Sequence, residues 1–353
     1  MPDSILALCY LLASALSLVV LTSISPERVL QQSVVLIIGF IIFIYLSRQD
    51  SAIFKTLAPF LYILILILLI ATLIFGSAIR GSTSWIELAG FQLQASELAK
   101  PLLVLAFPFF LQMFPPKTFV NIVVNTVIFI IPVFLIFKQP DLGTALVVSS
   151  IWISGMFVSG LSFWLIGIVA LFFLGALRYL PSFLREYQLR RIETFIDPFR
   201  DPLGAGYNVI QSIIAVGSGG ILGKGLGHGT QSHLRFLPER HTDFIFASLA
   251  EELGLVGSLL VIFSLGGLLY RLLNLATHTK SSSSRLIYIG IFSYLFFQTY
   301  INIGMNIGVA PVTGVTLPLI SYGSSSVIAT AITLGIAGSC ARSDKSRNLI
   351  EIK

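Results

Sequence analysis

Long apolar runs dominate the pattern of hydrophobic and polar positions along the chain. A helix that crosses the hydrocarbon core of a bilayer needs about 20 consecutive, mostly apolar residues. Runs of this kind occur near residues 5–22, 29–47, 56–76, 97–114, 119–137, 144–160, 163–181, 244–272, 284–306 and 322–341. The pattern predicts an all-α integral membrane protein with ten transmembrane helices. One long loop, at about residues 182–243, follows the seventh helix.

The composition agrees with a membrane protein. Of the 353 residues, 56% are hydrophobic and only 11% are charged, whereas a soluble domain carries roughly 25% charged residues. The net charge of +6 does not indicate nucleic-acid binding, because no basic stripe with interleaved aromatic residues is present. No linker or tail is long enough for a separate soluble domain. Residues 1–353 are therefore expected to form a single polytopic membrane domain.

Basic residues predict the orientation. An even number of spans places both termini on one side of the membrane, and Lys and Arg in short loops mark the cytoplasmic side. The short segments on the side of the termini contain Arg48, Lys55, Lys117, Arg271, Lys280, Arg285, Arg342, Lys345, Arg347 and Lys353, and the opposite short segments contain Arg28, Arg80, Lys100 and Lys138. Both termini are therefore expected in the cytoplasm, and residues 182–243 are expected on the outer side.

Two clusters of polar residues lie near the predicted outer face before the long loop. Glu97 and Lys100 are three residues apart, so they share a helix face and can pair. Trp85 alternatively indicates an interfacial hairpin, since Trp is enriched at the membrane boundary, and both interpretations stay open. Asp141 precedes the sixth span, where capping of that helix is the favoured interpretation. Lys138 beside it is expected to extend its ammonium group toward water.

The long loop contains a glycine-rich stretch at residues 217–229. It does not match a Walker motif, because Ser218 stands where glycine is required and Gly225 stands where Ser or Thr is required. The glycines instead allow the backbone to lie close to a ligand or to packed helices. The loop histidines do not have zinc-site spacing, and no metal site is predicted.

Asp243 is the last acidic residue before Phe244, Ile245 and Phe246 enter the predicted eighth span. It lies at a boundary between water and lipid and close in sequence to several cationic residues. A carboxylate in such surroundings is suited to act as a general base.

Residues 304–326 are rich in Gly, Pro and Ser although they lie at membrane depth. This composition predicts interrupted helix. Interrupted helix is tolerated in a membrane only where it packs inside protein or lines a water-filled cavity.

Several of these motifs together resemble the SEDS family (shape, elongation, division and sporulation), and RodA-like members more than FtsW-like ones. The most specific part is Asp201 to Gly254, with GYNVIQS, GSGGILGKG, GTQ and FLPERHTDFIFASLAEELGLVG; QPDLGT and PVTGVTLPLISYG agree with it. Leu142 in QPDLGT favours RodA. Three positions depart from the family pattern. No basic residue stands just before Trp85, QASE replaces QPSE, and SYGSSS replaces SYGGSS.

The resemblance implies a peptidoglycan glycosyltransferase of the cytoplasmic (inner) membrane that serves cell-wall elongation and cell shape. Such proteins polymerise lipid II, an undecaprenyl-pyrophosphate-linked disaccharide-pentapeptide, on the outer membrane face, together with a class B penicillin-binding protein. The acceptor 4-hydroxyl attacks the donor's anomeric carbon, and polyprenyl pyrophosphate departs with inversion. The resemblance leaves open whether a divalent cation, Mg²⁺ or Mn²⁺, assists.

The resemblance also implies roles for individual residues. Asp243 matches the family's essential loop aspartate and is the expected catalytic base. The expected substrate and cavity residues are Glu97, Lys100, Asp141, Gln211, Lys224, Gln231, Arg235, Glu239, Arg240, His241 and Ser321.

Three alternatives remain. A lipid II flippase would also need many spans, interrupted helices and intramembrane charges, but it should carry its polar residues near the bilayer midplane. An FtsW-like division glycosyltransferase would share the chemistry. A non-catalytic scaffold for wall synthesis would not need Asp243.

Overall fold

The computed structural model describes residues 3–79, 82–88, 91–162, 164, 167, 175, 186–204, 206–234 and 236–351. The predicted span at 163–181 lies almost entirely outside the described residues, and so does Arg235. The count of ten spans is therefore not tested.

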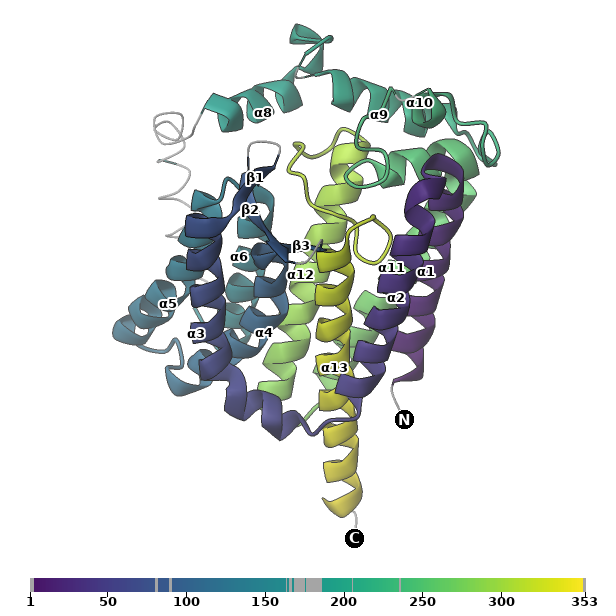
Figure 1. Ribbon diagram of the computed structural model, residues 1–353. Coiled ribbons are helices and arrows are strands. Elements are labelled where there is room, and N and C mark those ends of the chain that lie inside the picture. Colours follow the sequence, from purple (N-terminus) through teal and green to yellow (C-terminus); the bar gives the residue numbers. More distant parts are fainter. Residues whose placement is uncertain are drawn as a thin grey trace.

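Nine long helices follow the other nine predicted spans (Figure 1). They are α1 (Ser4–Ile24), α2 (Pro26–Ser47), α3 (Ser51–Phe75), α4 (Ala95–Met113), α5 (Phe119–Lys138), α6 (Leu142–Val158), α11 (Ile245–His278), α12 (Ser282–Asn306) and α13 (Ser324–Glu351). Among the described residues, eight of these are long and apolar enough to cross a membrane, and α6 is shorter, with 17 residues. The chain is a multi-pass membrane protein.

The long loop and the termini lie at opposite ends of the molecule. The loop contains α8 (Glu186–Ile196), a 3₁₀ turn η2 (Pro198–Arg200), α9 (Tyr207–Ser218) and the short α10 (Thr230–His233). Figure 1 shows α8, α9 and α10 across one end of the helices and both termini at the other. Termini at one end are what an even number of crossings requires.

A small antiparallel sheet follows α3. Its strands are β1 (Ser77–Ile79), β2 (Ser82–Leu88) and β3 (Phe91–Gln94), in the order β1-β2-β3. Trp85 of β2 pairs with Gln94 of β3, so this segment forms a hairpin, while its predicted placement at the membrane boundary stays a prediction. The main-chain amide of Gln94 also donates to Ser325 Oγ (3.0 Å) at the start of α13. This bond connects the sheet to the helices.

The glycine-rich stretch packs against an interruption in α11. At Gly254 the backbone has φ 64° and ψ −157°, a conformation that favours glycine, and α11 loses its own hydrogen bonds there. The loop supplies replacements: Lys224 N to Glu251 O (3.0 Å), Gly225 N to Glu252 O (3.0 Å), Leu255 N to Gly220 O (2.9 Å) and Val256 N to Ile221 O (3.2 Å). Of the two roles left open for these glycines, the described contacts support close packing against a helix.

The connection from α12 to α13, residues 307–323, is irregular, as predicted. It is not a surface loop, because Val315, Leu317, Ile320 and Ser321 are all buried. Its buried backbone groups need hydrogen-bond partners, and polar side chains of the surrounding helices provide several of them.

Candidate functional site

The first part of the site is an ion pair inside the helix bundle. α4 contacts α3, α6, α12 and α13, and its first turns contain Glu97 and Lys100. These side chains are 5% and 1% exposed, and Lys100 Nζ lies 2.7 Å from Glu97 Oε1. The predicted pairing is confirmed. A buried lysine is costly unless it is paired, so each charge depends on the other.

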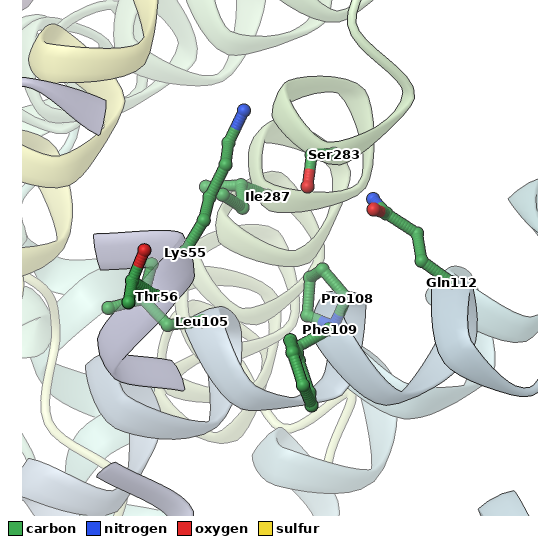
Figure 2. A pocket seen from close by; sticks show the side chains of 8 residues that line it. All are labelled: Lys55, Thr56, Leu105, Pro108, Phe109, Gln112, Ser283 and Ile287. Carbon is green, nitrogen blue, oxygen red and sulfur yellow. The ribbon is translucent and has the colours of Figure 1, made fainter. Parts of the chain in front are cut away.

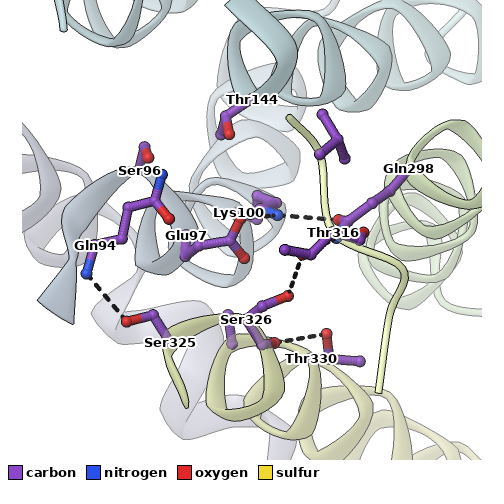
Figure 3. A network of polar contacts seen from close by, with 12 residues as sticks. Gln94, Ser96, Glu97, Lys100, Thr144, Gln298, Thr316, Ser325, Ser326 and Thr330 are labelled. Carbon is purple, nitrogen blue, oxygen red and sulfur yellow. Dashed lines mark hydrogen bonds and ion pairs between the residues drawn. The ribbon is translucent and has the colours of Figure 1, made fainter. Parts of the chain in front are cut away.

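Lys100 is also connected to the irregular segment through Gln298 of α12 (Figure 3). Lys100 Nζ donates to Gln298 Oε1 (3.0 Å), and Gln298 Nε2 donates to Thr316 O (2.8 Å). Thr316 Oγ1 in turn lies 2.8 Å from Ser326 Oγ on α13. One network therefore joins α4, α12, α13 and the segment 307–323.

Asp141 has a capping role and a bridging role at once. Its Oδ1 accepts from Thr144 N (3.0 Å), which caps α6 as expected. Its Oδ2 accepts from Gln94 Nε2 (3.1 Å) and Ser96 Oγ (2.8 Å). Asp141 thus connects the start of α6 to the start of α4.

Asp243 lies two residues before the start of α11. Its side chain is half-buried, and its main-chain oxygen accepts from Asn302 Nδ2 (3.1 Å) and Asn306 Nδ2 (3.0 Å). A methyl group added at Gly314 would lie 3.7 Å from Asp243 Oδ2. The carboxylate therefore faces the irregular segment 307–323.

The turn before Asp243 contains three of the expected site residues. Glu239 Oε2 accepts from Thr242 Oγ1 (2.9 Å), and Arg240 Nε donates to Ile24 O (3.1 Å) at the end of α1. The His241 ring meets the Tyr322 ring edge-on, with centroids 5.7 Å apart.

Ser321 holds the same turn from the other side. Its hydroxyl donates to Thr242 O (2.7 Å) and accepts from Leu317 N (2.8 Å). Glu239, Arg240, His241 and Ser321 thus lie in or against the turn that precedes Asp243.

Lys224 and Gln231 belong to a different cluster. Both bind Glu251 of α11: Lys224 Nζ lies 2.8 Å and Gln231 N lies 2.9 Å from Glu251 Oε1. These contacts hold the loop against α11. Gln211 lies half-buried on α9, next to Ser212, whose hydroxyl donates to Asn306 O (2.9 Å).

Sequence reasoning missed two groups of residues in these clusters. Gln298, Asn302 and Asn306 are all completely buried, and their spacing of four residues, with amide side chains inside an apolar span, was the available signal. Glu251 and Glu252 are adjacent acidic residues, also completely buried. Acidic residues inside a span are rare and informative.

A cavity of about 320 Å³ lies near the ends of α3, α4 and α12 that face the termini (Figure 2). None of the predicted site residues lines it; the lining consists of Lys55, Thr56, Leu105, Pro108, Phe109, Gln112, Ser283 and Ile287. Within the part of the chain that the structure describes, no three His, Cys, Asp or Glu side chains group as metal ligands would.

Comparison with known proteins identifies the family. The family model for cell cycle proteins that is named after FtsW, RodA and SpoVE matches residues 4–346. The chain belongs to this family. A similar curated relative is the peptidoglycan glycosyltransferase MrdB of Escherichia coli K12, which is 42% identical over 302 residues, 84% of this chain and 81% of the relative. The probable peptidoglycan glycosyltransferase FtsW of Coxiella burnetii is 36% identical over 82% of this chain and 80% of its own.

Solved structures share the fold over nearly the whole chain. One belongs to a work entitled "Structural coordination of polymerization and crosslinking by a peptidoglycan synthase complex" and matches with TM-score 0.84 and 38% identity over 98% of both chains. The rod shape determining protein RodA of Thermus thermophilus matches with TM-score 0.74 and 32% identity, again over 98% of both chains.

Proposed function

We propose that the chain is a RodA-like peptidoglycan glycosyltransferase that polymerises lipid II into glycan strands on the outer face of the cytoplasmic membrane. Its 42% identity to MrdB supports this function and favours an elongation role over division. The observation that carries the proposal is the position of Asp243. Its carboxylate is half-buried at the start of α11 and faces Gly314, while its main chain is bound by two buried amides.

Asp243 is the proposed catalytic base. Its carboxylate takes the proton from the acceptor 4-hydroxyl as that oxygen attacks the anomeric carbon of the donor. The new C–O bond forms while the bond to the pyrophosphate oxygen breaks, with inversion. A positioned base of this kind contributes roughly 10²–10⁴-fold to a rate.

Arg240 and Lys100 have different proposed tasks. Arg240 is half-buried in the turn before Asp243, where its charge would stabilise the departing pyrophosphate. The charge of Lys100 is balanced by Glu97 at 2.7 Å. Lys100 would therefore hold the segment 307–323 in place through Gln298.

The network also bears on the flippase alternative. Gln298 and Asn306 are eight residues apart on α12, which is roughly 12 Å along a helix. The polar network therefore continues about two turns deeper than Asp243, and a transporter with a polar site inside the bundle remains an alternative that the assay must separate.

The test of the proposed function is polymerisation of labelled lipid II by purified protein in detergent, with its class B penicillin-binding partner present. Glycosyl transfer needs no membrane between two compartments, so glycan that a muramidase digests should form. Reactions with Mg²⁺, with Mn²⁺ and with a chelator would determine cation dependence. Polymer should still form when a β-lactam blocks the partner's transpeptidase. No polymer under any of these conditions, together with lipid II translocation in liposomes, would reject the enzyme in favour of the flippase.

We also propose that both termini lie in the cytoplasm and that the loop carrying α8 to α10 lies outside. Arg200 of η2 and Ser282, the first residue of α12, are both exposed. η2 lies between α8 and α9 in the chain, and Figure 1 shows these two helices at the end of the molecule opposite the termini. Arg200→Cys should react with an impermeant thiol reagent in intact cells, and Ser282→Cys should not. The native Cys9 and Cys340 are buried, so background labelling should be low. The reverse pattern would overturn the orientation.

A further inference from the structure

The buried side-chain amides of Asn302 and Asn306, on α12, bind the same main-chain oxygen. Both side chains are completely buried, and both donate to the main-chain oxygen of Asp243, at 3.1 and 3.0 Å. Buried carbonyl groups need a partner, but two side-chain donors from another helix on one carbonyl fix its direction as well. The position of Asp243 is therefore set by α12.

Asn306 also controls how α11 begins. The first amide groups of a helix have no partner within the helix, and Phe244, at the N-cap position of α11, makes no side-chain capping bond. Asn306 Oδ1 accepts from Ala247 N in the first turn (3.1 Å). One carboxamide thus holds Asp243 with its nitrogen and the start of α11 with its oxygen.

Asn302 connects Asp243 to the segment that its carboxylate faces. Its Nδ2 donates to Val315 O (2.7 Å) as well as to Asp243 O (3.1 Å). Val315 follows Gly314, the residue opposite the carboxylate. The same amide group therefore binds both the Asp243 main chain and the segment that the carboxylate faces.

We infer that Asn302 and Asn306 are positioning residues for Asp243, holding its main chain so that the carboxylate keeps the position, facing Gly314, from which it takes the acceptor's proton. The inference rests on the proposed function, since it assigns Asp243 as the base. The two amides act through Asp243 and are not assigned a contact with substrate. A misplacement of about 1 Å at a reacting group can reduce a rate about 10²-fold.

The variants separate positioning from simple stabilisation. Asn306→Asp keeps an oxygen acceptor for Ala247 N and removes the amide donor to Asp243 O, whereas Asn302→Ala removes the donors to Asp243 O and Val315 O. Asn125→Ala is the matched control. Asn125 of α5 is also a buried carboxamide that donates to two main-chain oxygens, those of Phe114 (2.7 Å) and Asn121 (2.8 Å).

The first readout is steady-state polymerisation of lipid II by the purified protein with its partner. Asn302→Ala and Asn306→Asp should each lower kcat about 10–100-fold, with KM for lipid II within about twofold of the wild-type value. Asn125→Ala should leave both constants unchanged. Wild-type kcat in Asn302→Ala and Asn306→Asp would overturn the inference, and so would an equal loss in Asn125→Ala.

The second readout does not depend on activity. Hydrogen exchange should become faster in a peptide covering residues 243–247 in Asn302→Ala, and it should not in Asn125→Ala. Unchanged exchange there would refute the inference even if the enzyme were active. If the wild-type protein made no polymer, the proposed function would fail, and the exchange of residues 243–247 would still decide whether the amides hold Asp243.

Discussion

Glu97 and Glu251 are both buried acidic residues in membrane helices, but their surroundings differ. Glu251 is completely buried and accepts from Lys224 Nζ, Thr230 Oγ1, Gln231 N, Ser232 N and Ser232 Oγ. Glu97 accepts from Lys100 Nζ through Oε1, whereas its buried Oε2 has no hydrogen-bond partner among the described residues. Both oxygens of Glu251 are therefore engaged in contacts within the fold, whereas Glu97 retains one oxygen that could still accept a hydrogen bond.

The regions around these two residues differ less than the two carboxylates do. The Glu251 region joins the glycine-rich loop to α11. Glu252 Oε2 and Gln231 Oε1 are buried there without a partner among the described residues, and the other Glu252 oxygen binds Ser23 Oγ (2.7 Å) and His233 Nε2 (2.9 Å). In the region between Lys100 and Asp243, Asn302 Oδ1 and Thr313 Oγ1 are also buried without a partner among the described residues. The difference is therefore clearest at the carboxylates themselves. The full set of partners around Glu251 indicates a structural role, whereas a buried group with unused capacity, such as Glu97 Oε2, is expected where a site binds or reacts.

The largest effect is expected at Asp243. Asp243→Asn removes the proton acceptor with little change in shape, so polymerisation should fall at least about 100-fold. The melting temperature and the binding of the penicillin-binding partner should change little, because asparagine keeps the shape of the side chain and the main-chain oxygen keeps its bonds from Asn302 and Asn306. Lipid II polymerisation and a thermal melt of the same preparation measure both. Wild-type rates would reject the general-base assignment.

Glu251→Ala should instead destabilise the fold. The change leaves the partly exposed Lys224 without its ion-pair partner and removes the acceptor of two main-chain amides, each of which costs about 1–3 kcal/mol when it is left unsatisfied. We expect a clearly lower melting temperature and faster proteolysis of the loop at residues 219–234. Normal stability with abolished polymerisation would contradict the structural role assigned to Glu251, because it would indicate a role in catalysis.

The sequence predicted those features of the fold and the site that leave a local pattern in the chain. Apolar runs predicted the nine described spans, because burial in lipid imposes a composition on each one separately. The Glu97–Lys100 pair followed from local spacing, and the interrupted segment 307–323 followed from its Gly, Pro and Ser content.

The contacts around Asp243 could not be predicted in the same way. Asn302 and Asn306 are single polar residues in an apolar run, and their shared partner, Asp243, lies about 60 residues away, just before another helix begins. Likewise, a lysine in a glycine-rich loop is typical of a ligand-binding site, but in the structure Lys224 is paired with Glu251. A motif indicates that a residue has a role, but only its tertiary contacts show whether that role is structural or is to bind a substrate.

A smaller effect is expected at Gly314, where the backbone has φ +75°. Gly314→Ala adds strain of about 1 kcal/mol and places a methyl group 3.7 Å from Asp243 Oδ2. We expect kcat to fall several-fold, measured as initial rates at saturating lipid II. Gly227→Ala is the control, since φ there is +81° and a methyl group would meet nothing within 4 Å. Equal rates in the two variants would show that the space beside Asp243 is not used.

The smallest effect on catalysis is expected at Lys224, which the sequence resemblance places among the substrate residues. Its ammonium group already donates to Glu251 Oε1 (2.8 Å) and Thr230 Oγ1 (2.9 Å), and its amide donates to Glu251 O (3.0 Å). Lys224→Gln retains a hydrogen-bond donor but leaves the completely buried Glu251 carboxylate without its cation. Stability should fall by about 3 kcal/mol, the lower end for a broken buried pair, because Glu251 keeps its four other hydrogen bonds. The kcat and the KM for lipid II should both stay within about twofold of wild type. A tenfold rise in KM at unchanged stability would instead show that Lys224 binds the substrate. Lys224 would then belong to the substrate site and not to the structural contacts around Glu251.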